Sequence, residues 1–440
     1  GLSGWTRRSP RTARAIPCGD VPMVAAFNAK EQPAEVDFDS LDHEEWIDAL
    51  EAKMREAGKD ARGEALEDFQ AVFDKCERET AKGLSEGWFT RDELDIKFGK
   101  GFWRPAECFA VWQRGALRVC DNCAASRHND GTGLHNGLTL DRPDFPALVA
   151  ALFAEALGFD ERWALEGGTD DVQSAYRRLK TWAPQYGVAA VWDPVRREVR
   201  YMTRPGLSFG LKAAPMLFNR FTAMATQIAR RVYGWCGCIY FDDGCTVEPT
   251  FARRSGQRAV RALMESMGMP FSPLDDAKHV PMRARFVFLG VEADLARAWE
   301  AQEVTLGVTA ERQARMLETI DFLCDTDTCF PGDAAKLVGR LGFATQWTYG
   351  RFGRAILQPL LRRAQREAHE ALVDAAVRGA LHFFRSVLGR PGGLPRRRYR
   401  LRPDGRGTVW IWTDAMYEEG KPAMLAFVVR FSGGRGERPR

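Results

Sequence analysis

Apolar residues recur at helical spacing in several stretches of the chain, and these stretches alternate with short runs that favour strands. Trp46, Leu50 and Met54 lie on one face of a predicted helix, a pattern typical of a helix that packs on a core. The same spacing predicts four more helices, with apolar faces made by Leu66, Phe69, Phe73 and Cys76, by Leu148, Leu152 and Phe153, by Leu217, Phe221, Met224 and Ile228, and by Val260, Leu263, Met264 and Met267.

Strand-favouring runs come in pairs that are separated by turn residues. Residues 109–112 and 117–120 flank one turn, and residues 187–192 and 199–203 flank Asp193-Pro194, so each pair predicts a hairpin. A further strand at 285–290 is expected to close this part of the chain, and the pattern beyond it to about 390 is mostly helical. The predicted fold class is α+β, with an antiparallel sheet backed by two helices.

Charge is nearly balanced over the whole chain but not along it. The 440 residues are 45% hydrophobic, which is typical of a folded protein with two to four domains or subdomains. Lys and Arg number 63 against 59 Asp and Glu, so the net charge of +4 argues only weakly for a polyanionic partner. Arginine is dense between 351 and 406. Such a run is most often a solvated face, and the alternative is a surface that follows a phosphate backbone.

Ten cysteines are scattered without the spacing of a secreted disulfide framework, and no signal peptide or membrane-spanning run is evident. We therefore expect an intracellular protein, in the cytoplasm or the nucleus, with no membrane partner. Cys120, Cys123 and His128 suggest zinc, but no second ligand pair follows at a suitable spacing, so structural roles are favoured. The chain starts at Gly1 and a new strand pattern begins at Val409, so both ends are expected to belong to a longer protein.

Two adjacent carboxylates, Asp242 and Asp243, follow the strand-favouring run 239–241. Adjacent negative charges at a turn cost stability unless a cation or hydrogen-bond donors neutralise them. Most such pairs are surface turns, and the functional alternative is a site for Mg²⁺, which prefers hard oxygen ligands. Asp171, at the end of a neighbouring predicted strand, would supply a third carboxylate for two-metal phosphoryl transfer.

Several ordered motifs between residues 77 and 358 resemble those of reverse transcriptases, particularly the retrotransposon enzymes. DVQSAY at 171–176 is similar to the family's first catalytic motif, YMTRPGLSFGLKAAPMLFNR at 201–220 to its second block, and YFDD at 240–243 to its Tyr-x-Asp-Asp hallmark. Residues 109–129 resemble the fingers hairpin, and FLG at 288–290 the primer-grip strand. Two departures occur: Ser208 replaces the usual Pro, and Ala116 or Leu117 stands where a Lys usually precedes the hairpin Arg.

The resemblance implies roles for individual residues. The catalytic carboxylates would be Asp171, Asp242 and Asp243, which would bind two Mg²⁺ ions, with Mn²⁺ able to substitute. Lys278 would be a general acid, or, as the plainer alternative, a solvent-exposed lysine.

The nucleotide-binding residues would be Arg118, Tyr176, Gly210, Tyr240 and Phe241. Among them, Tyr176 would be a steric gate, because an aromatic ring beneath the sugar leaves no room for a ribose 2′-OH. Asp121 and Asn129 match structural positions of the family. Asp414, in the run 409–415, would be the first ligand of an incomplete RNase H-like site.

A right-hand polymerase of fingers, palm and thumb, with a ferredoxin-like antiparallel palm sheet, is the architecture that the resemblance implies. Its parts would be an N-terminal extension at 1–75, irregular over 1–35, fingers at 76–165, a palm at 166–292 that includes a fingers hairpin at 185–205, a helical thumb or connection at 293–400, and the truncated start of an RNase H-like domain at 405–440. No ribonuclease H activity is expected from this fragment.

The implied function is an RNA-directed DNA polymerase, a nucleotidyltransferase that adds dNTPs to a primer 3′-OH on an RNA or DNA template. One alternative is a catalytically silent retroelement relic that still binds nucleic acid. Another is an RNA-templated RNA polymerase, which Tyr176 and the FGLxxAP block disfavour.

Overall fold

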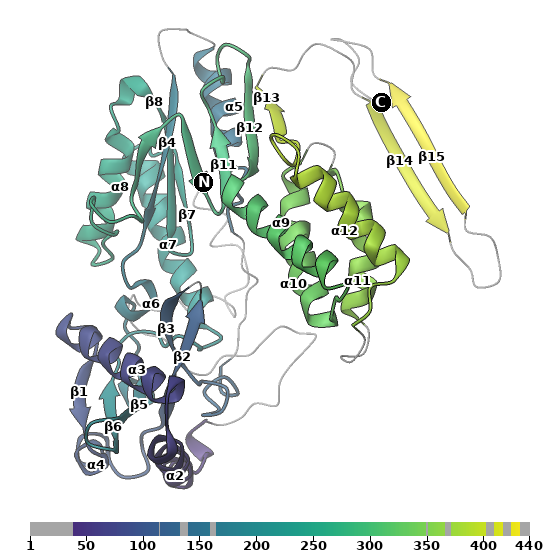
Figure 1. Ribbon diagram of the computed structural model, residues 1–440. Coiled ribbons are helices and arrows are strands. Elements are labelled where there is room, and N and C mark those ends of the chain that lie inside the picture. Colours follow the sequence, from purple (N-terminus) through teal and green to yellow (C-terminus); the bar gives the residue numbers. More distant parts are fainter. Residues whose placement is uncertain are drawn as a thin grey trace. The chain divides into compact units, whose positions relative to one another are not determined.

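A computed structural model describes residues 38–113, 115–132, 140–158, 164–348, 351–365, 371–401, 409–416 and 424–431. Helices and strands are mixed along the chain, which confirms the α+β class (Figure 1). The chain forms two compact units. The first consists of Gly1–Arg142, Gly168–Thr246 and Arg254–Met282, and the second of Pro143–Gly167, Val247–Arg253 and Arg283–Arg440.

A five-stranded sheet in the first unit has the strand order β1-β6-β5-β2-β3. Both predicted hairpins are confirmed in it, because β2 pairs antiparallel with β3 and β5 pairs antiparallel with β6. A parallel pairing of β2 with β5 joins the two hairpins. The strands are β1 (Glu86–Phe89), β2 (Pro105–Gln113), β3 (Ala116–Asp121), β5 (Val188–Asp193) and β6 (Glu198–Thr203).

The two amphipathic helices predicted first are α2 (His43–Asp60) and α3 (Glu64–Ala81). Leu50 and Met54 of α2 are buried in a core cluster with Trp192 of β5, as the pattern predicted. In α3 the buried stripe contains Val72 and Cys76, whereas Leu66 is 42% exposed, so the predicted face was wrong at its first position. A shorter helix, α4 (Arg91–Phe98), begins at a capping box formed by Thr90 and Glu93.

A four-stranded sheet of order β7-β8-β4-β9 carries the predicted aspartates. Its strands are β4 (Leu165–Asp171), β7 (Gly237–Tyr240), β8 (Asp243–Pro249) and β9 (Val280–Arg283). The predicted helices α7 (Ala214–Val232) and α8 (Ser255–Ser266) share a core cluster with this sheet through Phe218, Phe221, Ile239, Val260 and Met264. The expected sheet backed by two helices is therefore present. Met224 of α7, predicted to be buried, is 41% exposed, because Ala225 and Ala229 occupy the buried face instead.

The strand predicted at 285–290 does not close this sheet. β10 (Arg285–Phe288) is followed by Leu289 and Gly290, with φ values of 51° and 76°, and the chain turns back into β11 (Val291–Asp294). These two strands form a separate sheet of order β10-β11-β12-β13, in which β12 is Glu303–Val308 and β13 is Arg397–Arg400. The chain after residue 290 is therefore less helical than expected.

The second unit also contains α5 (Phe145–Leu157), whose buried face differs from the predicted one. Leu148 and Leu152 are 58% and 55% exposed, whereas Val149, Ala150 and Ala154 are buried. Because this helix is apolar almost all round, periodicity could not select its buried face.

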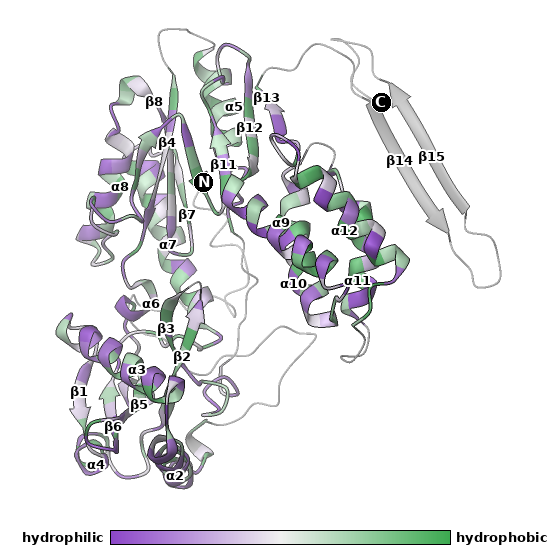
Figure 2. Cartoon of the chain, in the orientation of Figure 1, coloured by the Kyte–Doolittle hydropathy of each residue, from purple (hydrophilic) through white to green (hydrophobic). Residues whose placement is uncertain are grey.

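The remaining helices of the second unit each carry apolar and polar residues on different faces (Figure 2). They are α9 (Ala310–Asp325), α10 (Pro331–Gln346), α11 (Gln358–Ala364) and α12 (Ala375–Leu388). Shorter helical turns of the two units are η1 (Phe38–Ser40), α6 (Ala175–Arg178), η2 (Pro184–Tyr186), η3 (Thr250–Ala252) and η5 (Arg354–Leu357). Within the described ranges, no helix combines the length and the apolar character that crossing a membrane requires.

A strand does begin at Val409 as predicted. β14 (Val409–Met416) pairs antiparallel with β15 (Met424–Phe431). The backbone of Asp414 thus lies in a strand, while its side chain and the irregular segment predicted at 1–35 fall outside what the structure describes. The RNase H-like assignment stays a prediction.

Candidate active site

A tight hairpin turn carries the adjacent aspartates. Tyr240 at the end of β7 pairs with Asp243 at the start of β8, so Phe241 and Asp242 alone form the turn. Phe241 has a φ of 51°, a left-handed conformation that an aromatic residue adopts only where the surrounding structure holds it. Its ring packs edge-on against that of Tyr240, with centroids 4.9 Å apart. The turn therefore holds both aspartates at one end of the sheet.

The end of β4 lies beside this turn. Asp171 is the last residue of β4, and the backbone N–H of Val172 donates to the carbonyl oxygen of Asp242 at 2.8 Å. On its other side, the backbone N–H of Ser272 donates to the carbonyl oxygen of Asp171 at 2.8 Å. The structure thus brings together the three aspartates that the sequence singled out.

Burial and mutual repulsion raise the pKa of two of these aspartates. For Asp242, burial is the main cause of the raised pKa, and the charge of Asp171 adds to it. Burial raises the pKa of Asp243 to about 6, and the charges of Asp242 and Asp171 act in the same direction. Lys278 opposes both shifts without cancelling them. Carboxylates perturbed in this way are typical of functional sites.

Lys278 is the cation nearest to the cluster. Its Nζ lies 2.6 Å from Oδ2 of Asp171, although the lysine side chain is 60% exposed. The backbone N–H of Lys278 donates to Oδ1 of Asp276 at 2.9 Å, which anchors the segment that carries it. The structure therefore places Lys278 at the predicted carboxylates, while its catalytic role stays a prediction.

The donor set suits a divalent cation by its chemistry, since Mg²⁺ is held in proteins by carboxylate oxygens, water and phosphate. Across the described part of the chain, however, no three His, Cys, Asp or Glu side chains stand close enough together to hold a metal ion. The ammonium of Lys278 instead supplies a positive charge at Asp171.

Asp170, beside Asp171, is a buried carboxylate for which the sequence predicted no role. Its side chain is 3% exposed and accepts hydrogen bonds from Nε2 of Gln257 at 3.0 Å and from Arg261, and it lies 2.7 Å from Nδ1 of His279. Successive strand residues point to opposite faces of a sheet. That alternation was the signal that could have separated an inward Asp170 from an Asp171 facing the turn.

Tyr176, the predicted steric gate, lies in α6 and is half-buried. Its ring centroid is 5.2 Å from that of Phe209 and 5.4 Å from that of Phe218. Burial, and then the charge of Asp242, raises the pKa of Tyr176 to about 12, so the phenol stays neutral near pH 7. The ring is therefore fixed by packing within electrostatic reach of the aspartates.

Position 210 requires glycine, because the backbone there lies close to the backbone of Asp121. Its φ is 115°, and a Cβ built on it would lie 2.1 Å from the carbonyl oxygen of Asp121. Asn129 supports the same loop, because its side chain donates to the carbonyl of Gly210 at 3.0 Å and accepts from the N–H of Lys212 at 2.8 Å. The predicted approach of Gly210 to a nucleotide stays a prediction.

Asp121, at the end of β3, is part of a buried ionic network. It accepts from Arg177 at 2.9 Å and from Arg204, and all three side chains are at most 1% exposed. Burial alone would raise the pKa of Asp121, but Arg177 and Arg204 outweigh it and leave the pKa lowered. This geometry agrees with the structural role that the resemblance implies. Arg118, also on β3, is exposed, and its charge acts on Asp242 more weakly than that of Lys278.

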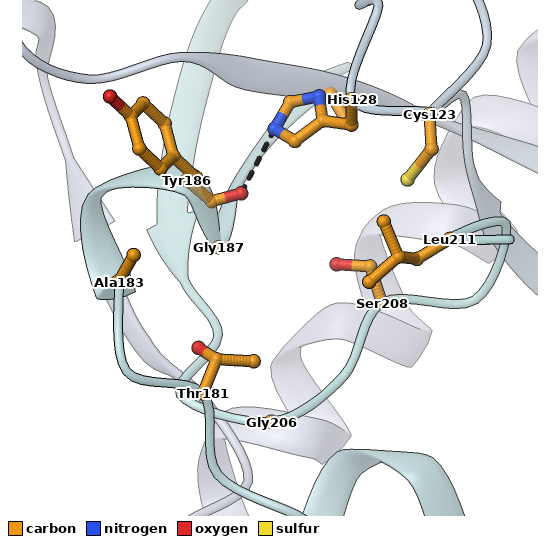
Figure 3. Close-up of a pocket in the computed structure, with 10 residues that line it drawn as sticks. Cys123, His128, Thr181, Ala183, Tyr186, Gly187, Gly206, Ser208 and Leu211 are labelled. Carbon is orange, nitrogen blue, oxygen red and sulfur yellow. Dashed lines mark hydrogen bonds between the residues drawn. The ribbon is translucent and has the colours of Figure 1, made fainter. Parts of the chain in front are cut away.

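A small pocket lies beside the loop that contains Ser208 and Leu211, with Cys123 and His128 above that loop in the view and Ala183 and Tyr186 across from it (Figure 3). Nε2 of His128 lies 3.0 Å from the carbonyl oxygen of Tyr186, and Nδ1 lies 2.6 Å from Oγ of Ser126. Burial lowers the pKa of His128 to about 4, so the ring is neutral. Because both ring nitrogens have protein partners, the geometry favours a structural His128 over a zinc ligand.

Comparison with known proteins finds likenesses among solved structures. No family model matches the chain, and no curated protein sequence matches it. Among solved structures, the foamy viral protease-reverse transcriptase dRH in complex with double-stranded DNA matches at 15% identity, with a TM-score of 0.49. The match covers 74% of this chain and 49% of that one, so the chain spans about half the length of that protein.

Proposed function

We propose that this chain is a nucleotidyltransferase that extends a primer with dNTPs on an RNA or DNA template, a reverse transcriptase. The observation that supports this most is the meeting of Asp171, Asp242 and Asp243 at the paired ends of β4 and the β7–β8 turn, with raised pKa values at two of them. A buried carboxylate pair that the fold leaves without full neutralisation is costly unless a ligand supplies the charge.

Those three aspartates would hold two Mg²⁺ ions, with Mn²⁺ as a substitute, and the bound ions would supply the charge neutralisation on which attack by a primer 3′-OH depends. The carboxylates must be ionised to do so. Because the pKa of Asp243 is about 6, its ligand form is depleted as the pH falls through that value. Protons and Mg²⁺ therefore compete for this carboxylate, and we expect the affinity of the chain for Mg²⁺ to weaken below about pH 6.

The chain's own side chains would position the reactants and the proton. Lys278, at 2.6 Å from Asp171, would hold a proton for the pyrophosphate that leaves. Tyr176, whose half-buried ring packs against those of Phe209 and Phe218, would exclude a ribose 2′-OH. Arg118, exposed on β3, would bind the triphosphate as a fixed positive charge.

In this proposal the sheet β7-β8-β4-β9 with α7 and α8 is the palm, and the sheet β1-β6-β5-β2-β3 belongs to the fingers. The hairpin at 185–205 would then belong to the fingers, which its membership of the five-stranded sheet supports. The helices from α9 to α12 would form the thumb or connection.

A catalytically silent protein that binds nucleic acid is the second candidate. It is favoured by one observation, namely that no group of three ligands is already assembled for a metal within the residues described. The two candidate functions make different predictions for Asp242. A polymerase needs this carboxylate for DNA synthesis, whereas in a silent binding protein its removal changes only the charge of the surface.

Primer extension on an RNA template with Mg²⁺ separates the two candidates. We would compare the unchanged chain with Asp242→Asn and with Asp130→Asn, an exposed aspartate paired with Arg127, as the matched control. Synthesis from dNTPs but not from ribonucleotides, reduced about a thousandfold in Asp242→Asn alone, is the expected result. No synthesis by the unchanged chain, with primer–template still bound, would favour the silent protein.

A further inference from the structure

The residue that follows Lys278 is tied to a buried anion. The side chain of His279 is 9% exposed, and its Nδ1 lies 2.7 Å from Oδ1 of Asp170. Because an ionised carboxylate only accepts hydrogen bonds, the ring donates to Asp170. The backbone N–H of His279 also donates to the carbonyl oxygen of Asp276 at 2.9 Å. The segment that carries Lys278 is therefore held by hydrogen bonds on its buried side.

The same carboxylate is held from α8. Gln257 and Arg261, one helical turn apart, both donate to Asp170. Arg261 also donates through Nη2 to the carbonyl oxygen of Ser272 at 2.7 Å. Since Ser272 in turn contacts the backbone of Asp171, a single buried anion links α8, the end of β4 and the segment before β9.

This linkage matters because the contact between Lys278 and Asp171 is weak by itself. A lysine that is 60% exposed loses side-chain entropy when it holds one geometry, and solvent screens its charge. Its backbone must therefore be placed by something else. The hydrogen bond from His279 to Asp170 fixes the backbone one residue away, on the buried side.

We propose that Asp170 is a positioning residue, which acts through His279 to hold Lys278 against Asp171. The inference rests on the proposed function, because the position of Lys278 affects turnover only if the chain extends primers. It goes beyond that function by assigning a role to a carboxylate and a histidine that touch neither the substrate nor the reacting atoms.

The first test measures the reactivity of Lys278 and needs no catalytic activity. The full chain would be labelled briefly with acetic anhydride, and acetylation of Lys278 would be quantified by mass spectrometry. His279→Leu removes the tether and should raise labelling at least about tenfold, the lower end of the factor expected for one hydrogen bond to a charged group. His279→Asn, whose Nδ2 can take the place of Nδ1, should restore slow labelling.

Tyr201→Phe is the matched control, because it removes a buried hydrogen bond of 2.6 Å to Glu51 elsewhere in the same unit. It should leave the labelling of Lys278 unchanged. Asp170→Leu is a second variant, which removes the acceptor at a similar size, and it should behave like His279→Leu. Unchanged labelling in folded His279→Leu and folded Asp170→Leu would overturn the proposal.

The second test is a double-mutant cycle on primer extension. His279→Leu should lower kcat about tenfold with an unchanged KM for primer–template. In a Lys278→Ala background it should lower kcat no further, since the positioned group is absent. An equal loss in both backgrounds would show a general structural role and contradict the proposal. If the unchanged chain binds but does not extend a primer, the proposed function fails and the labelling result alone decides the positioning.

Discussion

The aspartates of the five-stranded sheet and of the four-stranded sheet differ in how their charge is compensated. Asp121, at the edge of the five-stranded sheet, is fully buried, yet two arginines hold its pKa below the usual value. Asp242 and Asp243, in the four-stranded sheet, are less deeply buried, yet their pKa values are raised. The direction of the pKa shift therefore depends on whether the fold places cations beside the carboxylate, and not on how deeply the carboxylate is buried.

The same contrast separates two neighbours in β4. Asp170 has Arg261, Gln257 and His279 as partners, whereas the carboxylate of the next residue, Asp171, has an exposed lysine and a long hydrogen bond of 3.5 Å from the hydroxyl of Ser272. A carboxylate whose charge is satisfied within the fold has a structural role. One that is left with like charges around it is suited to bind a ligand of opposite charge. This difference can be tested by removing an arginine that compensates Asp121 in the five-stranded sheet, or by removing one of the mutually repelling carboxylates in the four-stranded sheet.

The largest change in stability is expected when a cation that compensates a buried carboxylate is removed. Arg204→Met leaves Asp121 and Glu79 short of a buried partner, so we expect the free energy of unfolding to fall by about 3 to 5 kcal/mol. Urea unfolding would measure it. Arg127→Met, which breaks an exposed ion pair with Asp130, is the control and should cost less than about 1 kcal/mol. Similar losses in the two variants would contradict the comparison.

A smaller loss is expected from Gly210→Ala, which pushes the loop off the carbonyl of Asp121. The added Cβ would meet that oxygen at 2.1 Å, and the positive φ is unfavourable for alanine, so we expect a loss of about 2 to 3 kcal/mol. Gly339→Ala in α10 is the matched control, since nothing lies within 4 Å of its added Cβ. That change should stabilise the chain by about 0.5 to 1 kcal/mol. Thermal unfolding would show whether the two changes have opposite signs.

The smallest effect is a gain in stability from Asp243→Asn. Because the folded pKa of Asp243 is raised to about 6, its contribution to stability is fully present below the unfolded value near 3.8 and is lost as the pH rises through 6. Above pH 6 and without divalent ions, the free energy of unfolding of the variant should therefore be about 1 to 2 kcal/mol higher than that of the unchanged chain. Below pH 4 the two should agree. A variant less stable than the parent at pH 7 would show that the charge is compensated after all.

Much of the fold followed from the sequence because hairpins and amphipathic helices have strong local patterns. The two hairpins of the five-stranded sheet and the helices α2, α7 and α8 were predicted close to their observed places. The failures came where pattern carries no information. The apolar helix α5 offered no single face, and the partner of β10 depended on a tight turn at Leu289 and Gly290 rather than on strand propensity.

At the candidate site, the meeting of Asp171 with Asp242 and Asp243 was expected and is observed. The partners of Asp170 were not predicted, because Gln257 and His279 come from segments far along the chain. Local sequence cannot show such contacts. It does contain a weaker signal, the alternation of faces in β4, which distinguishes an inward carboxylate from an outward one.

Binding of Mn²⁺ tests most directly whether the raised pKa values mark a cation site. The free ion would be followed by electron paramagnetic resonance, with a primer–template that lacks a 3′-OH present and its own binding subtracted. Asp242→Asn would be compared with the unchanged chain and with Asp130→Asn. The account predicts Mn²⁺ binding by the unchanged chain and by Asp130→Asn, and its loss in Asp242→Asn. Equal binding by all three would contradict it.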